Sequence, residues 1–162
     1  AGMEDVDVTR GLKDSPGFVG GVSIPAVPGA PWLQVGFERT NIAYTPPETK
    51  NGVWYRHFAH KGGWALDEGP LGHPLGGHGY ESLGFARADL FEARIRLAAR
   101  YFERNRGQQN LYAPARRGRS SGYAFELQWR FRPWGELGVS GYRESGGSWE
   151  ENRFQAGVAL RM

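Results

Sequence analysis

The chain has 162 residues, of which 40% are hydrophobic and 14% aromatic, and its formal net charge is +3. This length suits a single domain, and no shift in composition marks a boundary between two. The apolar residues are spread along the chain, so no stretch approaches the roughly 18 consecutive apolar residues of a membrane-spanning helix. A helical membrane protein is therefore excluded.

Cysteine is absent, which removes disulfide frameworks and thiolate metal sites. The first residues, Ala1 to Asp5, lack the basic and apolar regions of a signal peptide, so any export signal was cleaved or lies in a longer precursor. We expect residues 1–17 to form an irregular N-terminal segment. Twenty-five glycines and ten prolines are typical of strands joined by turns.

Residues 122–132 give the clearest element, because large apolar and polar side chains alternate with period two. Five large apolar residues opposite a face with two arginines indicate lipid on one side of a strand and a wet lumen on the other. The apolar positions are Tyr123, Phe125, Leu127, Trp129 and Phe131.

Further strands are predicted from the same pattern. Residues 134–143 and 153–162 follow, and residues 81–87 form a strand with Leu83 and Phe85 facing outward. Residues 91–101 alternate as well, although Phe91, Ile95 and Ala98 also fit a helical face. The neighbouring hairpins favour the strand, with a turn at 88–90. Residues 18–26, 32–39 and 53–60 are less regular extended segments.

Connection lengths support a membrane barrel, because bacterial barrels alternate short periplasmic turns with longer external loops. Residues 88–90 and 132–134 are short connections, whereas residues 61–79 and 105–120 are expected to be long external loops. The 41–51 connection, with Pro46 and Pro47, breaks this alternation.

The sequence thus predicts an all-β protein, an antiparallel transmembrane β-barrel with about eight strands in residues 1–162. Eight strands would suffice to close a barrel. However, residues 18–26 contain Gly20, Gly21 and Pro25 and make a poor closing partner for the last strand. We therefore expect the chain to be the C-terminal part of a larger barrel in an outer membrane.

Arginine greatly exceeds lysine, at seventeen residues against three. Two explanations account equally well for this excess. One is compositional bias, and the other is a preference for the planar guanidinium, which binds carboxylate, phosphate and sulfate groups. On neighbouring strands the arginines predict a basic lumen surface, and three more lie in a predicted loop. Either they bind an acidic ligand, or they form internal ion pairs with Glu92 and Glu126. The strand positions are Arg94, Arg96, Arg100, Arg130 and Arg132, and the loop positions are Arg116, Arg117 and Arg119.

Other candidate sites are weaker. His57 and His60 would point to opposite faces of a strand, and His73 and His78 lack a nearby third ligand, so neither a metal nor a cofactor is expected. A hydrolase would need a nucleophile and a base, for which Ser82 or Ser140 with a histidine are the only candidates. No spacing in the sequence supports a catalytic triad. A nucleic-acid partner is not expected from the loop arginines, which suit anionic saccharide or lipopolysaccharide phosphate better. The simplest interpretation of these arginines is a solvated loop without a ligand.

One segment resembles a known family. Residues 53–64, followed by Gly69-Pro70-Leu71-Gly72-His73-Pro74-Leu75-Gly76 and Glu81-Ser82-Leu83-Gly84, resemble the C-terminal part of the capsule assembly Wzi family. The similarity in order and spacing covers roughly residues 33 to 105. Trp64 and Ala65 stand where the family more usually has tyrosine and arginine.

The resemblance implies a larger outer-membrane barrel that binds and anchors or organises exported capsular polysaccharide or exopolysaccharide, in a lectin-like and non-enzymatic role. Its expected partners are an acidic polysaccharide, outer-membrane lipid and lipopolysaccharide, and the polysaccharide export machinery. The alternative is a small barrel enzyme acting on the acyl chains of lipid A. The residues expected to bind polysaccharide are Arg116, Arg117, Arg119, Arg94, Arg96 and Arg130.

Overall fold

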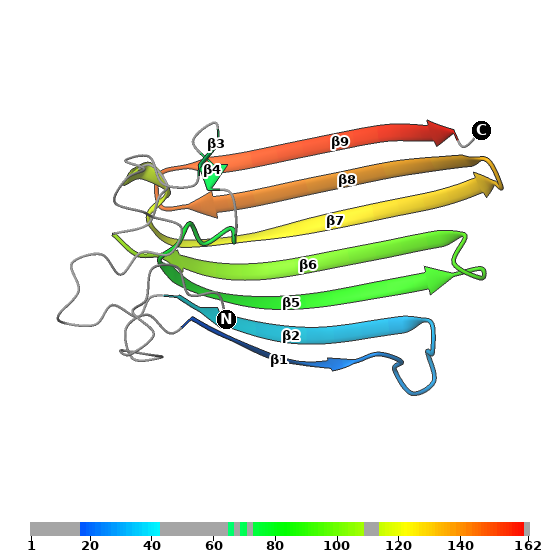
Figure 1. The fold of residues 1–162 in the computed structure, drawn as a ribbon, viewed down its shortest axis with the longest axis horizontal. Helices are drawn as coiled ribbons and strands as arrows, with labels where there is room; N and C mark the ends of the chain where they lie inside the picture. Colours follow the sequence, from blue (N-terminus) through cyan, green and yellow to red (C-terminus); the bar gives the residue numbers. More distant parts are fainter. Residues whose placement is uncertain (1–16, 43–64, 67–68, 71–72, 109–113, 161–162) are drawn as a thin grey trace, which may run out of the picture.

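A computed structural model describes residues 17–42, 65–66, 69–70, 73–108 and 114–160, and most of these form one antiparallel sheet (Figure 1). Seven strands lie side by side in the order in which the chain reaches them. A two-stranded hairpin of β3 (Ala65–Leu66) and β4 (Gly69–Pro70) stands apart from the sheet. The seven strands are β1 (Phe18–Ile24), β2 (Leu33–Asn41), β5 (Gly79–Leu90), β6 (Ile95–Arg106), β7 (Gly118–Arg132), β8 (Gly135–Gly146) and β9 (Glu150–Leu160).

The connections differ between the two ends of the sheet. Residues 25–32, 91–94 and 133–134 join strands at one end, which we call the turn end. Residues 42–78, 107–117 and 147–149 join strands at the other end, the loop end, which lies on the left of Figure 1. The longest connections thus gather at one end, as in bacterial outer-membrane barrels.

The strand predicted at residues 91–101 is confirmed, but it begins later than expected. Phe91, Glu92 and Ala93 have φ angles of 52°, 57° and 60°, in the left-handed region that L-residues seldom adopt. They form the turn between β5 and β6, so Arg94 belongs to this turn and not to the strand. The turn expected at 88–90 is instead the last part of β5.

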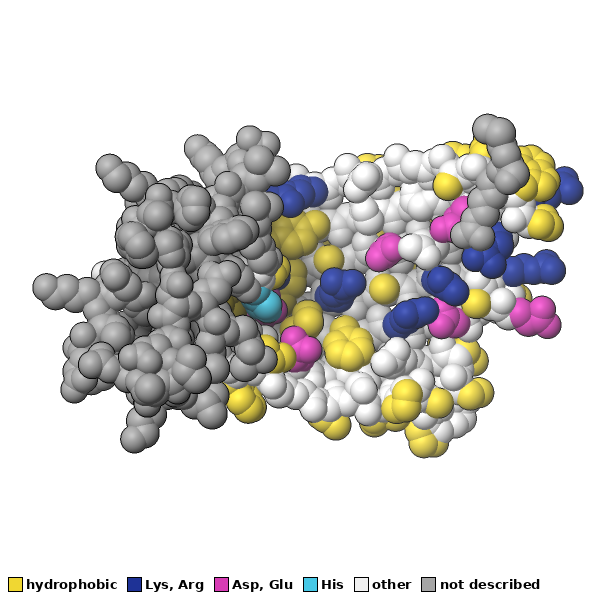
Figure 2. All heavy atoms as spheres, viewed as in Figure 1, with side chains coloured by type: hydrophobic (Ala, Val, Ile, Leu, Met, Phe, Trp, Pro, Cys, Tyr) yellow, Lys and Arg dark blue, Asp and Glu magenta, His cyan; other side chains and the backbone are white. Residues whose placement is uncertain are grey.

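The strand register separates two faces, because directly paired residues of neighbouring strands project to the same side. Leu97 of β6 pairs with Leu127 of β7, which pairs with Val139 of β8. Every strand of the sheet adds apolar side chains to this side, which we call the apolar face. The opposite side, the polar face, carries the charged residues that alternate with them (Figure 2).

The prediction that Leu83 and Phe85 face outward is wrong. Leu83 pairs with Phe102 and Phe85 pairs with Arg100, so both lie on the polar face. The ring of Phe85 lies over Gly36 of β2, where an added Cβ would come within 2.4 Å of it. On β5 the apolar face carries mainly small residues such as Ala86 and Ala88, so the larger side chains misled the sequence reading.

The strand expected at residues 53–60 lies outside the described residues. β2 pairs directly with β5 over nine residue pairs, so no strand separates them in the sheet. The 41–51 connection, which breaks the predicted alternation of connection lengths, falls, except for Asn41 at the end of β2, within the connection of residues 42–78 at the loop end. With this pairing, the two longest connections, 42–78 and 107–117, both lie at the loop end.

The sheet is a single open layer among the described strands. β1 and β9 are its two edges and are not paired with each other. Six successive antiparallel pairings make β1 and β9 run in the same direction, as Figure 1 shows. Direct closure of β1 on β9 would therefore create a parallel pair. An all-antiparallel barrel containing this sheet needs an odd number of additional strands.

Gly122 on β7 provides a test of this packing. A Cβ at this position would lie 2.2 Å from the carbonyl oxygen of Arg143 and 2.5 Å from the Phe102 ring, whereas Gly138 faces open space. We expect Gly122→Ala to lower the free energy of unfolding by about 1–3 kcal/mol through overpacking. The matched variant Gly138→Ala should stay within about 0.5 kcal/mol of wild type. Urea unfolding in detergent micelles measures both, and equal stabilities would contradict the register at Gly122.

Candidate functional site

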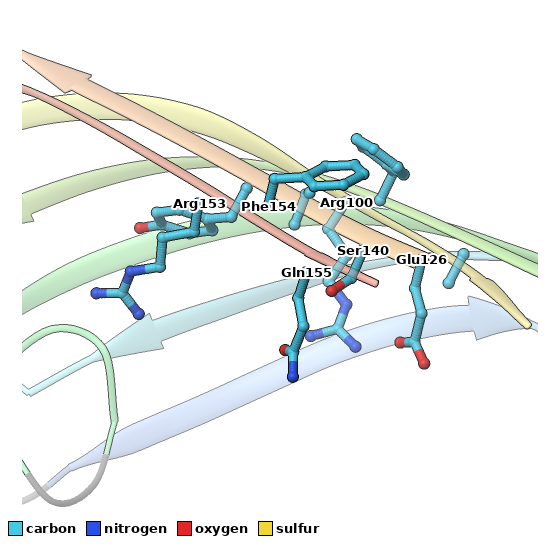
Figure 3. Close-up of a pocket in the computed structure, with 11 residues that line it drawn as sticks. Arg100, Glu126, Ser140, Arg153, Phe154 and Gln155 are labelled. Carbon is cyan, nitrogen blue, oxygen red and sulfur yellow. The ribbon is translucent and has the colours of Figure 1, made fainter. Parts of the chain in front are cut away.

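Polar side chains from four neighbouring strands gather on the polar face midway along the sheet (Figure 2). They line a groove of about 260 Å³ (Figure 3). We call these side chains the polar tract. Its members are Arg100 of β6, Glu126 of β7, Ser140 of β8, and Arg153 and Gln155 of β9.

The register explains why these residues converge. Glu126 pairs with Ser140, and Ser140 pairs with Gln155, so the three form a row across β7, β8 and β9. Arg100 and Arg153 lie in the adjacent row, nearer the loop end. Figure 3 shows these polar side chains on one side of the sheet and the Phe154 ring on the other.

Arg100 differs from Arg153, the other arginine of the polar tract, in its ion pairing. Its side chain is exposed, and no acidic side chain in the part of the chain that the structure describes forms an ion pair with it. Arg153, in contrast, donates from Nε to Glu151 at 2.6 Å. Arg100 can therefore bind an anionic group without first breaking an internal pair.

The space beyond the tract is open toward the turn end. A second hollow of about 490 Å³ shares Glu126, Ser140 and Gln155 with the first and continues over Gly138 and Gly157. A Cβ built on either glycine meets no atom within 4 Å. Amide, hydroxyl and carboxylate groups around an open floor can hydrogen-bond to the hydroxyl groups of a saccharide.

The polar face is closed at the loop end by a buried network of charges centred on Glu144 of β8, which is 1% exposed. Arg106 donates from Nη1 and Nη2 to the two carboxylate oxygens of Glu144 at 2.6 and 3.1 Å. Arg104 donates to Glu144 at 2.9 Å and also pairs with Glu81. The hydroxyl groups of Ser120 and Tyr142 donate to Glu144 as well. We call these six residues the Glu144 network.

Residues 73–78, which precede β5, lie over this network. The carbonyl of Pro74 accepts a hydrogen bond from Arg106 Nε at 3.3 Å, and Leu75 is completely buried. Nδ1 of His73 accepts the backbone N–H of Leu75 at 3.2 Å, and its Nε2 faces Glu81 at 3.6 Å. Burial lowers the pKa of His73, with Arg104 adding to the effect and Glu81 opposing it. His73 is therefore neutral near pH 7, and Arg104 is the cationic partner of Glu81.

The Glu144 network was not foreseen from the sequence, although a signal for part of it was present. The alternation on β6 continues beyond Tyr101, so that Phe102, Arg104 and Arg106 stay on the polar face. The predicted strand ends at Tyr101 and the predicted loop begins at 105, so Arg106 falls in the loop and Arg104 in neither element. Extending period two by five residues would have found them.

The six arginines expected to bind polysaccharide lie in two groups at opposite ends of the sheet. Arg94, Arg96 and Arg130 are at the turn end, where the Arg130 backbone N–H donates to the Arg94 carbonyl at 2.8 Å. Arg116, Arg117 and Arg119 are at the loop end. Arg96 and Arg100 share the polar face with the even positions of β7, as expected. The two groups do not form one site.

Several of these arginines are already paired. Arg96 lies 3.5 Å from Asp89, and Arg130 lies 3.9 Å from Glu136. The sequence predicted Glu92 and Glu126 as the ion-pair partners of these arginines, but the partners are Asp89 and Glu136. Glu92 is in the turn, and Glu126 accepts a hydrogen bond from Gln128.

The loop-end arginines differ from one another. Arg116 ends a short 3-10 turn, η2 (Pro114–Arg116), and donates to Glu151 at 3.1 Å beside the Trp149 ring. Arg117 is exposed. Arg119 is at an odd position of β7 and therefore projects on the side of the apolar face.

The residues considered for other chemistry lie in different places. Ser140 is in the polar tract, and no histidine of the described residues lines its groove. Ser82 projects on the side of the apolar face, where Arg39 contacts its hydroxyl, whereas His73 faces Glu81 on the polar face. Among the described residues, no three His, Asp or Glu side chains lie together as a metal site. Within the same residues, no helix is long and apolar enough to cross a membrane. His57 and His60 lie outside the described residues.

These features define the class of protein: an all-β chain whose antiparallel meander, with one apolar and one polar face, is consistent with part of a β-barrel. The family follows from comparison with known proteins. The model of the family described as capsule assembly protein Wzi matches residues 3–155, and the chain belongs to this family. Comparisons with curated proteins and with solved structures gave no match.

Removing the central carboxylate tests the Glu144 network. In Glu144→Ala, two arginines that are 7% and 2% exposed lose their shared acid, and we expect unfolding to require about 3–5 kcal/mol less. The control is Glu150→Ala, which removes an exposed partner of Arg143 and should unfold close to wild type. Denaturant titration in micelles measures both variants. Equal destabilisation of the two variants would contradict the prediction that the buried carboxylate of Glu144 contributes more to stability than the exposed carboxylate of Glu150.

Proposed function

We propose that this sheet is part of the wall of an outer-membrane β-barrel that takes part in capsule assembly, and that its polar face binds acidic capsular polysaccharide or exopolysaccharide. Membership of the Wzi family supports the role in capsule assembly. Outer-membrane location is the natural setting for the observed pair of faces, since a barrel presents apolar side chains to lipid and polar ones to its interior.

The exposed apolar face is the observation that carries the membrane part of the proposal. Large apolar side chains remain exposed there, including Phe154 at 73% and Val158 at 64%. Only four hydrophobic residues of the described part are buried, so none of the described segments covers the face as a second layer. An apolar surface of this extent needs lipid or a partner over it.

The distribution of aromatic residues agrees with a lipid setting. Trp129, Phe131 and Trp134 form an exposed aromatic cluster at the turn end, with ring centroids 5.7 and 6.4 Å apart. Tyr101 and Tyr123 lie exposed nearer the loop end. From Tyr123 to Phe131 the strand rises roughly 26 Å at about 3.3 Å per residue. This length is comparable with the roughly 25 Å apolar band between the aromatic girdles of outer-membrane barrels.

The barrel would be closed by strands beyond those described here. The parallel direction of β1 and β9 means that an odd number of further strands would complete an antiparallel wall. This agrees with the proposal that the chain is the C-terminal portion of a larger barrel.

The polar tract is the proposed polysaccharide-binding surface. Arg100 offers a guanidinium without an acidic partner in the described residues, suited to bidentate contact with a uronate or pyruvate carboxylate. Gln155, Ser140 and Glu126 add hydrogen-bonding groups for sugar hydroxyls. Arg117 is a second, external candidate contact for the same polymer because it is exposed at the loop end.

The proposed role is non-enzymatic. A lectin-like surface needs donors, acceptors and cations that face an open groove, and the tract supplies these. Hydrolysis of lipid A acyl chains would need an activated nucleophile, and Ser82 lies on the face opposite His73. The export machinery is a further proposed partner, because an exported polymer must reach the barrel from it.

The polysaccharide proposal is tested with Arg100→Gln and its matched control Arg94→Gln. Both substitutions remove one exposed guanidinium, but Arg94 lies in the turn outside the tract. We expect Arg100→Gln to weaken binding of purified acidic polysaccharide about tenfold, as the loss of one charge-assisted contact predicts. Arg94→Gln should bind like wild type in calorimetry, and added salt should weaken wild-type binding. Unchanged affinity in Arg100→Gln, with normal folding, would remove the tract from recognition.

A further inference from the structure

A second cluster of polar residues lies at the loop end on the side of the apolar face. It comprises Arg39 of β2, Tyr80 of β5, Asn105 of β6 and Arg119 of β7, and we call it the rim cluster. The register places all four on one side, because Asn41 pairs with Tyr80, Tyr80 with Asn105, and Asn105 with Arg119. The four side chains line a hollow of about 470 Å³.

Contacts within the rim cluster hold its members in place. The Arg39 guanidinium carbon lies 4.6 Å from the centroid of the Tyr80 ring. The amide of Asn105 donates to the Tyr80 hydroxyl at 2.8 Å. Arg39 also contacts the Ser82 hydroxyl. The guanidinium of Arg39 is therefore held over a ring and next to a hydroxyl, on strands that a regular ladder keeps fixed.

The charge of the rim cluster favours an anion. Neither Arg39 nor Arg119 forms an ion pair with an acidic side chain in the part of the chain that the structure describes. One carboxylate, that of Glu103, also lines the hollow, and it accepts a hydrogen bond from Tyr101 at 3.0 Å. Arg143, on the neighbouring strand β8, is paired with Glu150 at 3.2 Å. Arg104 also lines the hollow, but it is paired with Glu81 and Glu144. Arg39 and Arg119 against Glu103 leave a positive site with tyrosine and amide groups beside it.

The position of the rim cluster relative to the apolar band indicates the source of the anion. On the same face, Phe37 is the next residue after Arg39 toward the turn end. On β6 and β7, Glu103 and Ser121 come next, then Tyr101 and Tyr123, and the apolar residues follow. Successive residues on one face of a strand are about 7 Å apart. Arg39 thus lies one step, and Tyr80, Asn105 and Arg119 two steps, beyond the aromatic edge of the band, or about 7–14 Å. This is the depth of lipid headgroups on the side with the long connections.

We propose that the rim cluster binds a phosphate group of lipid A in the outer leaflet. Paired guanidinium groups bind phosphate oxygens through charge-assisted hydrogen bonds, and a tyrosine hydroxyl and an amide can complete the contact. In an outer membrane, the leaflet on the side of the long external loops carries lipopolysaccharide. This site is separate from the polar tract, and it rests on the membrane placement proposed above but not on polysaccharide binding.

The test uses the complete barrel that contains this chain, in detergent, and compares Arg39→Gln/Arg119→Gln with the control Arg94→Gln/Arg132→Gln. The control removes two exposed arginines from the turn end. Native mass spectrometry measures binding of bisphosphorylated lipid A, of dephosphorylated lipid A and of phosphatidylglycerol. We expect wild type and the control to bind bisphosphorylated lipid A at least about tenfold more tightly than the other two lipids. The rim variant should lose this preference.

Two outcomes would overturn the proposal: an unchanged preference in the rim variant, or equal binding of phosphatidylglycerol and lipid A by wild type. Insertion of each protein into lipid vesicles is measured in parallel, by β-rich circular dichroism and heat-modifiable migration on a gel. Failure of the complete barrel that contains this chain to insert would refute the membrane placement itself. Normal insertion without any phosphate preference would refute the lipid A site alone.

Discussion

Directly paired residues in an antiparallel sheet project to the same face, and this one constraint organises the whole molecule. Because the register is unbroken across most of the seven strands, most apolar residues on one strand lie beside an apolar residue or a glycine on the next. A slip of one residue in any pair would exchange the faces of that strand. The two faces, the polar tract and the rim cluster all depend on this register.

In a single layer with one apolar and one polar face, neither face can be buried in a core shared with a second layer. Each face must therefore be stabilised in another way. On the apolar face, exposed aromatic and aliphatic residues require an apolar environment. On the polar face, the chain buries charges where the 73–78 segment lies over Glu144 and Arg106. Buried ion pairs stabilise a fold only when their remaining hydrogen bonds are also satisfied. Ser120 and Tyr142 supply those bonds to Glu144.

Much of this fold could be predicted from the sequence, because period two is a strong signal wherever large apolar and charged residues alternate. The strands around Phe125 and Phe154 were found for this reason. The face of β5 was not, because Ala86 and Ala88 give a weak apolar signal while Phe85 gives a strong one on the wrong side. When a strand has few bulky residues, the alternation of its side chains does not show which of its two faces meets lipid.

The candidate sites were harder to predict, because they depend on pairing between strands far apart in the sequence. The sequence indicated that Arg100 and Glu126 share a face, but Arg153 and Gln155 join them only through the register of β9. Arg119 was grouped with Arg116 and Arg117 by its position in the chain. Its strand position instead puts it beside Tyr80, on the other side of the sheet from the Glu144 network.

The central claim is that one face of this sheet meets lipid and the other meets water. The chain has no cysteine, so single cysteines at positions 124–129 of β7 can each carry a spin label in lipid vesicles. Oxygen, which concentrates in lipid, should collide with labels at 125, 127 and 129. A water-soluble nickel chelate should collide with labels at 124, 126 and 128. Accessibilities that do not alternate along these six positions would contradict the account.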